Sequence, residues 1–408
     1  MRKDLRTWLG LILLALWLCS PSAWAQEEVL VRGRVMDAGG AGLAGVLISD
    51  GHSVIKTGRD GVFSLKSRPG RVVCLSAPSG YEPPSPWWWA VEYAAKEDLD
   101  INLRQGRGKK GLPLIFMADL HLYDPHAPPS RPVPRERADL PMQVWHRLAG
   151  ELSRNPGALI VAAGDLCADA DYHKAAGAQA QLALATRALK MLPGPVRALP
   201  GNHDALYKGP QGPQVYLDLW RRHLGPARQV FLLEQAALIL WDNLGLEVDH
   251  RGKPLSCGRT SPQALSWLKE LLALIPIEKP LILVSHYPLL SPLAGSNPLW
   301  GRALVQAPSR SGLGLRNCDL AAQEVISLLS GRRVLALVNG HEHAYQESSL
   351  HMEAGDLRVV GLPALCGGWW KGSRRWGSNW FSAGYMLGHI KPGPTLETQL
   401  KEVRLEAR

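Results

Sequence analysis

The stretch Val334-Leu-Ala-Leu-Val-Asn-Gly-His-Glu-His343 joins an aliphatic run to two histidines one residue apart. Such a run is typical of a buried strand, so polar side chains are expected at the strand's carboxyl end. Four other short polar motifs are dispersed along the chain, and three of them also follow aliphatic runs. They are Asp119-Leu120-His121, Gly164-Asp165, Gly201-Asn202-His203-Asp204 and Ser285-His286. Because open α/β sheets build their sites at strand ends, we expect these motifs to meet at one edge of the molecule.

The chain from residue 114 onward alternates aliphatic strands with stretches suited to helices. Strands are predicted over 114–117, 159–163, 196–200, 237–241, 281–284 and 334–338. Helices are predicted over 142–153, 175–191 and 214–224, and another begins after Ser261, an N-cap that precedes a proline. This alternation predicts an α/β layered domain.

The region 28–104 contains short β-branched segments separated by turn residues, which predicts a small β-sandwich. The Gly-x-Val at Gly33, the segment 42–46 and the segment 57–63 resemble the carboxypeptidase-regulatory-like, transthyretin-type domain. That resemblance implies a spacer or docking module without catalytic residues. Three adjacent tryptophans, 87–89, follow in a Pro-rich connection, and we interpret them as a plug between domains in preference to a ligand platform.

The first 25 residues have the pattern of a secretory signal peptide. Basic residues precede an apolar run over 8–18, and Ala23-Trp24-Ala25 forms a small-x-small cleavage site. Cleavage would leave Gln26 first and would make the protein secreted or periplasmic. The apolar run is shorter than the roughly 20 residues of a membrane span, so no transmembrane anchor is expected in the mature chain.

The composition favours an anionic substrate over a specific nucleic-acid partner. The full sequence has a net charge of +10, but Lys and Arg are spread along it without long runs. Five cysteines remain after cleavage, and none lies in a CxxC pair, so neither a zinc knuckle nor a disulfide scaffold is indicated. One bridge, Cys257 to Cys318, stays open as an alternative.

Seven side chains in the five motifs are of the kinds that ligate divalent metals. They are Asp119, His121, Asp165, Asn202, His286, His341 and His343. A mixture of oxygen and imidazole donors suits manganese, iron or zinc. The sequence therefore predicts two divalent metal ions and no organic cofactor.

The spacing of these side chains assigns them to two ions. Asp119 and His121 alternate, so at a strand tip they project to the same side and can hold one ion. Asp165 can give one carboxylate oxygen to each ion, and Asn202 and His286 would hold the second. The two histidines of the opening motif would divide between the ions.

Two such ions would lower the pKa of a bridging water and so provide a hydroxide that attacks a phosphoester. His203 and Asp204 are the candidate catalytic residues. His203 would lie over the leaving group as a proton donor or transition-state stabiliser, and Asp204 would orient its neighbours.

The five motifs resemble the calcineurin-like metallophosphoesterases in type and in order. That resemblance implies an α/β fold, a four-layer α/β/β/α sandwich, over 112–345, with the seven side chains as dimetal ligands and His203 as catalytic. The segments 241–243, 263–268 and 369–370 look like the bacterial subgroup with an N-terminal β-module and a short β-rich C-terminal extension, here 346–408. Ala168 stands where the similar purple acid phosphatases have a tyrosine ligand, which disfavours that subgroup.

We therefore expect a secreted dimetal phosphoesterase that acts on a phosphomonoester or phosphodiester. Two alternatives stay open. One is a catalytically silent envelope or surface binding protein that docks through its β-module, and the other is a metallohydrolase that acts on a different bond. The Pro-, Gly- and Ser-rich segment 288–317 is predicted to be a substrate-facing lid.

Overall fold

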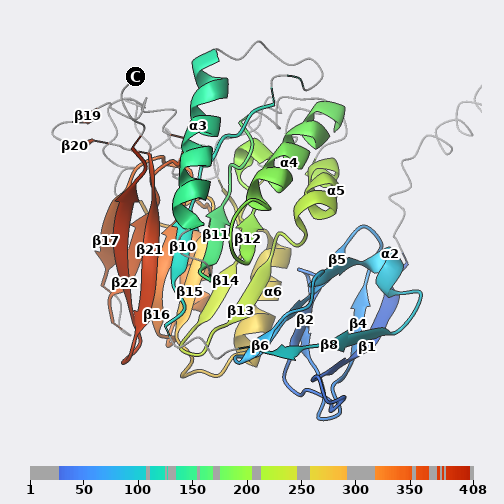
Figure 1. Cartoon of the computed structure of the whole chain (residues 1–408). Coiled ribbons are helices and arrows are strands. Elements are labelled where there is room, and N and C mark those ends of the chain that lie inside the picture. The colour runs from blue at the N-terminus through green and yellow to red at the C-terminus, as the bar shows by residue number, and fades with distance from the viewer. Residues whose placement is uncertain are drawn as a thin grey trace, which may run out of the picture.

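A computed structural model gives the arrangement of the chain (Figure 1). The structure describes residues 27–106, 111–124, 126, 135–153, 157–168, 175–204, 213–245, 258–291, 318–351, 355–366, 375–376, 379–380 and 383–404. The predicted signal peptide, almost all of the predicted lid and Cys257 lie outside these residues. No disulfide joins the cysteines within them, which are Cys74, Cys167, Cys318 and Cys366.

The N-terminal region is a β-sandwich of two sheets. One has the strand order β4-β1-β8, and the other has the order β3-β2-β5-β7. The strands are β1 (Val29–Met36), β2 (Leu47–Ser49), β3 (Val54–Lys56), β4 (Val62–Ser67), β5 (Val72–Ser76), β7 (Trp88–Ala90) and β8 (Leu99–Asn102). Alternating side chains such as Val31, Phe63 and Ile48 point inward and form a separate apolar core. A short helix α2 (Val91–Ala94) and the pair β6 (Tyr81–Glu82) and β9 (Arg104–Gln105) complete the module.

Two larger sheets form the centre of the molecule. The five-stranded sheet has the order β12-β11-β10-β21-β22, and the six-stranded sheet has the order β13-β14-β15-β16-β18-β17. The strands of the first are β10 (Leu114–Met117), β11 (Leu159–Ala163), β12 (Val196–Leu199), β21 (Gly384–Lys391) and β22 (Thr395–Glu402). Those of the second are β13 (Gln229–Leu232), β14 (Ala237–Leu240), β15 (Leu281–Ser285), β16 (Val334–Asn339), β17 (Gln346–Leu350) and β18 (Leu357–Gly361). β19 (Arg375–Trp376) and β20 (Asn379–Trp380) form a separate two-stranded sheet.

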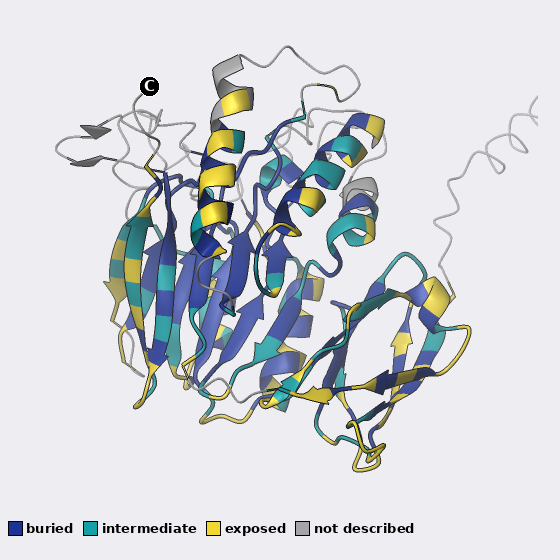
Figure 2. Ribbon diagram, viewed as in Figure 1, coloured by how far each residue is buried: buried dark blue, intermediate teal, exposed yellow. Residues whose placement is uncertain are grey.

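The strands that precede the predicted ligands run parallel to one another. β10, β11 and β12 are parallel neighbours in one sheet, and β15 and β16 are parallel neighbours in the other. Every residue of β10, β11 and β15 is buried, as expected for strands that are covered on both faces (Figure 2). Their carboxyl ends therefore lie at one edge of the sheets.

The two sheets pack face to face, and helices cover their outer faces. Phe116, Val161 and Val284 belong to the core between the sheets. Helices α3 (Arg135–Leu152), α4 (Ala175–Leu189) and α5 (Pro213–Leu224) cover the five-stranded sheet, and α6 (Pro262–Leu274) and α7 (Ala322–Leu328) cover the six-stranded one. The predicted four-layer α/β/β/α sandwich is confirmed.

Strands from the segment after residue 345 are built into both central sheets. β17 and β18 extend the six-stranded sheet beside β16, and β21 pairs with β10 in the five-stranded sheet. The predicted β-rich segment after residue 345 is thus part of the same layers. The domain boundaries that we drew from the sequence stay a prediction.

The N-terminal module packs against the central sandwich. Trp267 on α6 donates a hydrogen bond from Nε1 to Ser49 Oγ of the module at 2.9 Å. The guanidinium of Arg197 on β12 lies 4.0 Å from the ring centroid of Trp87. Trp87 therefore lies between the module and the sandwich, as the plug interpretation of the three tryptophans expects.

Within the described residues, no helix combines the length and the apolar character that a bilayer crossing requires.

Candidate metal centre

The loops that carry the predicted ligands are held together by backbone hydrogen bonds. The amide of Asp119 donates to the carbonyl of Gly164, and the amide of His121 donates to the carbonyl of Asp165, both at 3.0 Å. These bonds extend the pairing of β10 and β11 past the strand ends. As a result, two motifs about forty-five residues apart in sequence lie side by side.

The backbone is strained at five of the seven predicted ligands. Asp119, His121, Asp165, His341 and His343 have φ between 46° and 73°, and among the described residues they are the non-glycine residues with positive φ. This left-handed region is unfavourable for residues with a Cβ and is concentrated at functional sites. Here the left-handed conformation turns each side chain away from the direction of the preceding strand and toward the other ligands.

Motif glycines allow the chains to approach one another at this point. A Cβ on Gly201 would lie 2.2 Å from Asp165 Oδ1, and one on Gly164 would lie 2.5 Å from His286 Nδ1. Neither space can hold a methyl group. The Gly-Asp and Gly-Asn-His-Asp patterns therefore follow from the packing of the loops, since any larger residue would push Asp165 or His286 away.

The first cluster contains Asp119, His121, Asp165 and His343. Their ligand atoms all lie within 4.8 Å of one another, and all four side chains are buried. The Nε2 atoms of His121 and His343 are 3.1 Å apart, and His343 Nε2 lies 3.2 Å from Asp119 Oδ1. Two imidazoles and two carboxylates that converge in this way could hold one divalent ion.

The second cluster contains Asp165, His286 and His341, again with ligand atoms within 4.8 Å of one another. Asn202 completes it, because its Oδ1 lies 3.0 Å from His286 Nε2 and 2.9 Å from His341 Nδ1. All seven predicted ligands are thus brought together. Asp165 belongs to both clusters, so its two oxygens can serve two ions.

The donor set fits a cation. The carbonyl of Ala163 accepts a hydrogen bond from Nδ1 of His286 at 2.9 Å, which leaves the lone pair on Nε2. That lone pair faces Asn202 Oδ1 and Asp165 Oδ1, which lies 3.3 Å away. Three converging lone pairs are stable only with a proton or a metal ion among them.

The charges of the ligands agree with this interpretation. Burial, together with nearby His203, holds the pKa of His121 well below its usual value, and burial with nearby His286 does the same to the pKa of His341. Both rings are therefore neutral, which is the form that binds metals. Burial alone would lower the pKa of His286, but the Asp165 carboxylate beside it raises that pKa to about 9, so a cation that binds here would replace a proton on this ring.

The two predicted catalytic residues have different surroundings. His203 lies in a short 3-10 turn (Asn202–Asp204). Its amide donates to Asp165 Oδ1 at 2.7 Å, and its Nδ1 lies 2.6 Å from the carbonyl of Ala168. Asp204 is buried and accepts hydrogen bonds from the amides of Cys167 and Gly201. Asp204 thus fixes the loops around the site, and its side chain points to backbone amides. A structural role describes it better than a catalytic one.

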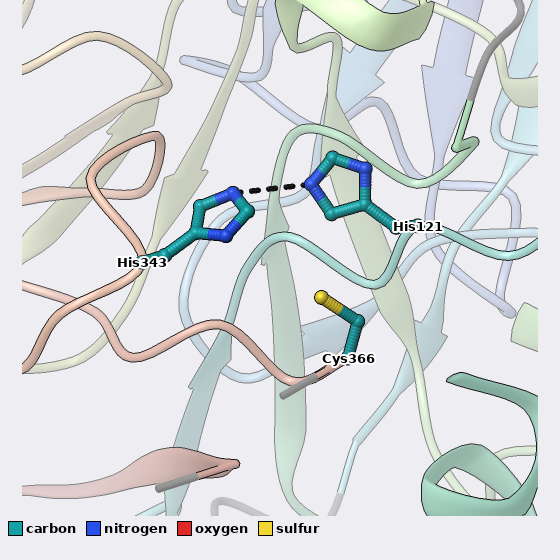
Figure 3. A group of neighbouring side chains, drawn as sticks. All are labelled: His121, His343 and Cys366. Carbon is teal, nitrogen blue, oxygen red and sulfur yellow. Dashed lines mark hydrogen bonds between the residues drawn. The ribbon is translucent and has the colours of Figure 1, made fainter. Parts of the chain in front are cut away.

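One residue at the site was missed from the sequence. The thiol of Cys366 forms a third group with His121 and His343, with ligand atoms within 4.8 Å of one another (Figure 3). No metal-binding spacing marks this cysteine in the sequence. The signal that could have indicated Cys366 was its position after the aliphatic run that becomes β18.

The fold and the shared carboxylate define a protein of two stacked sheets with a site at their strand ends that fits two metal ions. Residues 112–345, more than half of the chain, match the calcineurin-like phosphoesterase family, so the chain belongs to that family. Residues 29–93 match the family of its N-terminal domain, the N terminal of calcineurin-like phosphoesterase.

Individual relatives are more distant. The 3',5'-cyclic adenosine monophosphate phosphodiesterase CpdA of Escherichia coli is 33% identical over 135 residues, which are 32% of this chain and 40% of CpdA. A dimetal phosphatase from Danio rerio aligns over 72% of this chain and all of its own, with 14% identity and a TM-score of 0.44. The phosphopantetheinyl hydrolase of Mycobacterium tuberculosis aligns over 69% of this chain and 96% of its own, with 14% identity and a TM-score of 0.37.

Proposed function

We propose that this protein is a secreted dimetal phosphoesterase that hydrolyses a phosphomonoester or a phosphodiester. The observation that carries the proposal is the position of Asp165, which belongs to two ligand clusters at once. Two divalent ions held there would supply Lewis acidity toward phosphate oxygens and would make water more acidic. Such chemistry is the activity that the family name describes.

His203 can supply the proton that the leaving group of a phosphoester needs. His203 donates from Nδ1 to the carbonyl of Ala168, so the ring is held with Nε2 on its other side. The ring packs edge to face against His121, with 4.8 Å between centroids, and therefore lies beside the first cluster. When Nε2 also carries a proton, it can donate that proton to the leaving oxygen of a phosphoester.

A phosphodiester is the first substrate to test, because the E. coli relative is named as a cyclic nucleotide phosphodiesterase. Purified protein would be loaded with manganese, its metal content measured, and its turnover measured on bis-p-nitrophenyl phosphate, p-nitrophenyl phosphate, pyrophosphate and an amide. We expect two ions per chain and turnover of at least one phosphoester. Two tightly bound ions without turnover would support the silent binding protein, and amide or pyrophosphate turnover alone would support the third alternative.

Two variants separate metal binding from catalysis. Asp165→Asn removes the charge shared by both clusters, so we expect loss of both ions together with the activity. His203 is not itself a predicted metal ligand, although its neighbour Asn202 is. In His203→Ala both ions should therefore remain bound, while kcat falls by ~10²–10⁴-fold. Full turnover in His203→Ala would remove the proposed role of this histidine.

Secretion is the second part of the proposal, and the sequence of the first 25 residues supports it. Expression of the full chain, fractionation and N-terminal sequencing would test it. We expect the mature protein outside the cytoplasm with Gln26 as its first residue. A cytoplasmic protein that keeps Met1 would contradict secretion and would leave the proposed chemistry unaffected.

A further inference from the structure

Cys366 is fixed to the first metal cluster by the backbone. An isolated parallel bridge pairs Ala118, the first residue after β10, with Ala364, the third residue after β18. The amide of Leu365 donates to the carbonyl of Ala118 at 2.9 Å, and the amide of Cys366 donates to the carbonyl of Asp119 at 3.0 Å. The position of Cys366 is therefore tied to the strand end that carries Asp119.

The thiol points toward the two histidines of that cluster. Figure 3 shows the sulfur directed toward the rings of His121 and His343, and the ligand atoms of the three side chains lie within 4.8 Å of one another. Two ligands bound at about 2.0 and 2.3 Å to one ion lie roughly 3–4 Å apart. A rotation of the Cys366 side chain can bring the sulfur from within 4.8 Å of the histidine nitrogens to this separation. Of the four described cysteines, only Cys366 belongs to a group of metal-binding side chains.

We propose that Cys366 is a further ligand of the ion that Asp119, His121, Asp165 and His343 would hold. This inference rests on the metal centre of the proposed function. On binding, the S–H bond breaks, its proton leaves to solvent, and a sulfur electron pair forms the bond to the cation. The first position then has a sulfur donor in addition to nitrogen and oxygen donors.

A sulfur donor changes which metal the first position prefers. Thiolates favour zinc and other borderline or soft ions, whereas sites of oxygen donors suit manganese and magnesium. The second cluster contains no thiol, because Asp165, His286, His341 and Asn202 offer only oxygen and nitrogen. The two positions should therefore differ in metal preference, with zinc or iron(II) favoured in the first.

Cobalt(II) reports sulfur ligation directly. Thiolate bound to cobalt(II) gives an intense charge-transfer absorption in the near ultraviolet, which nitrogen and oxygen ligands do not give. The metal-free full chain would be titrated with cobalt(II). We expect this absorption to grow with one of the two ions. Two bound cobalt ions without the absorption would overturn the inference.

Substitutions of single cysteines identify which sulfur binds the cobalt ion. Cys366→Ser and Cys366→Ala should both lose the absorption, and the affinity for zinc relative to manganese should fall by about tenfold or more. Cys74→Ser is the matched control, since Cys74 is equally buried but lies in the N-terminal module. It should keep both properties. An absorption that persists in Cys366→Ser would contradict the assignment.

X-ray absorption of the zinc-loaded wild-type protein gives an answer that depends on no variant. A zinc–sulfur distance of about 2.3 Å is expected beside nitrogen and oxygen distances of about 2.0 Å. A spectrum with nitrogen and oxygen scatterers alone would reject the sulfur ligand. If the protein instead binds no divalent ion at all, the proposed function fails as well, so the two failures are distinguishable.

Discussion

At the scale of single residues, the site is built from conformations that an isolated chain avoids. A left-handed backbone costs an ordinary residue roughly 1–2 kcal/mol, and five of the predicted ligands adopt it. The rest of the fold must hold them there, and the backbone bonds between the loops after β10 and β11 do so in part. The ligands are consequently oriented before any ion arrives, which lowers the entropy lost on binding.

A first prediction concerns the glycine before Asn202. Gly201→Ala places a Cβ at 2.2 Å from both the amide nitrogen and Oδ1 of Asp165, so the two loops must separate. We expect the affinity for the metals to fall by at least about tenfold and the protein to be destabilised by about 2–3 kcal/mol. Isothermal titration with zinc and urea unfolding measure the two effects.

Gly150→Ala is the control for that experiment. Gly150 lies inside α3, and a Cβ there meets no atom within 4 Å. This substitution should stabilise the protein by up to about 1 kcal/mol and should leave metal affinity unchanged. Equal effects of the two substitutions would contradict the packing argument.

The types of the site residues were readable from sequence, whereas their conformations were not. Each ligand follows a strand or a motif that has a local pattern, so the seven residues could be named in advance. Cys366 could not, because its proximity to His121 depends on the pairing of segments about 245 residues apart. Long-range pairing leaves no local periodicity in a single sequence.

At the scale of elements, local signals predicted most helices and strands, and tertiary packing set the rest. Helix α6 begins after Ser261, as its N-cap and following proline indicate. Helix α3 instead begins at Arg135, seven residues before the predicted start, and includes Pro141. A proline usually marks a helix boundary, but here the helix continues through it. The seven-residue helix α7 and strand β13 are too short for a periodic pattern and were missed.

A second prediction tests the cap of α6. Ser261 Oγ accepts a hydrogen bond from the amide of Ala264 at 3.1 Å. Ser261→Ala should lower the free energy of unfolding by about 1 kcal/mol, because one amide at the start of the helix loses its acceptor. Urea unfolding followed by circular dichroism measures the change.

Ser266→Ala on the same helix is the matched control, because Ser266 is exposed in the helix interior. Alanine favours helix there, so stability should rise slightly or stay constant. A loss as large as that of Ser261→Ala would show that the cap is not the cause.

At the scale of the whole molecule, the N-terminal module and the sandwich are joined by buried polar and aromatic contacts. Arg197 is buried, and burial lowers its pKa to about 9. Its guanidinium lies over the rings of Trp87 and Phe231, at 4.0 and 4.4 Å from their centroids. Such contacts offset part of the desolvation of a charge. The sequence suggested a plug at the tryptophans but gave no sign that its partner was an arginine in a central-sheet strand.

A third prediction follows from this contact. Trp87→Ala removes the ring over Arg197 and leaves the cation buried, so we expect a destabilisation of about 2 kcal/mol. Differential scanning calorimetry should show a lower transition temperature. Tyr93→Ala is the control, because this tyrosine is 64% exposed in the same module and should change stability by less than about 0.5 kcal/mol.

A fourth prediction concerns pH. Burial, with Arg228 and Arg71 nearby, lowers the pKa of His52 from 6.5 to about 3. Between these two values the unfolded chain binds a proton that the folded chain does not, so stability decreases as pH falls through this window. Lowering the pH from about 7.5 to about 5.5 should remove about 1 kcal/mol through this residue.

His52→Gln isolates that contribution, because other groups titrate over the same range in both proteins. The difference in unfolding free energy between the two pH values should be smaller in His52→Gln than in the wild type. Identical pH dependence in the two proteins would show that His52 titrates normally in the folded state.

The pairing of β10 with β21 and of β16 with β18 has a practical consequence for anyone who works with the family-matched region alone. A polypeptide that stops at residue 345 would leave the amides and carbonyls of two aliphatic strands without partners along one side of each. Exposed edges of this kind recruit other chains, so such a fragment should be insoluble. Failure to obtain an active fragment would therefore reveal little about the chemistry of the intact protein.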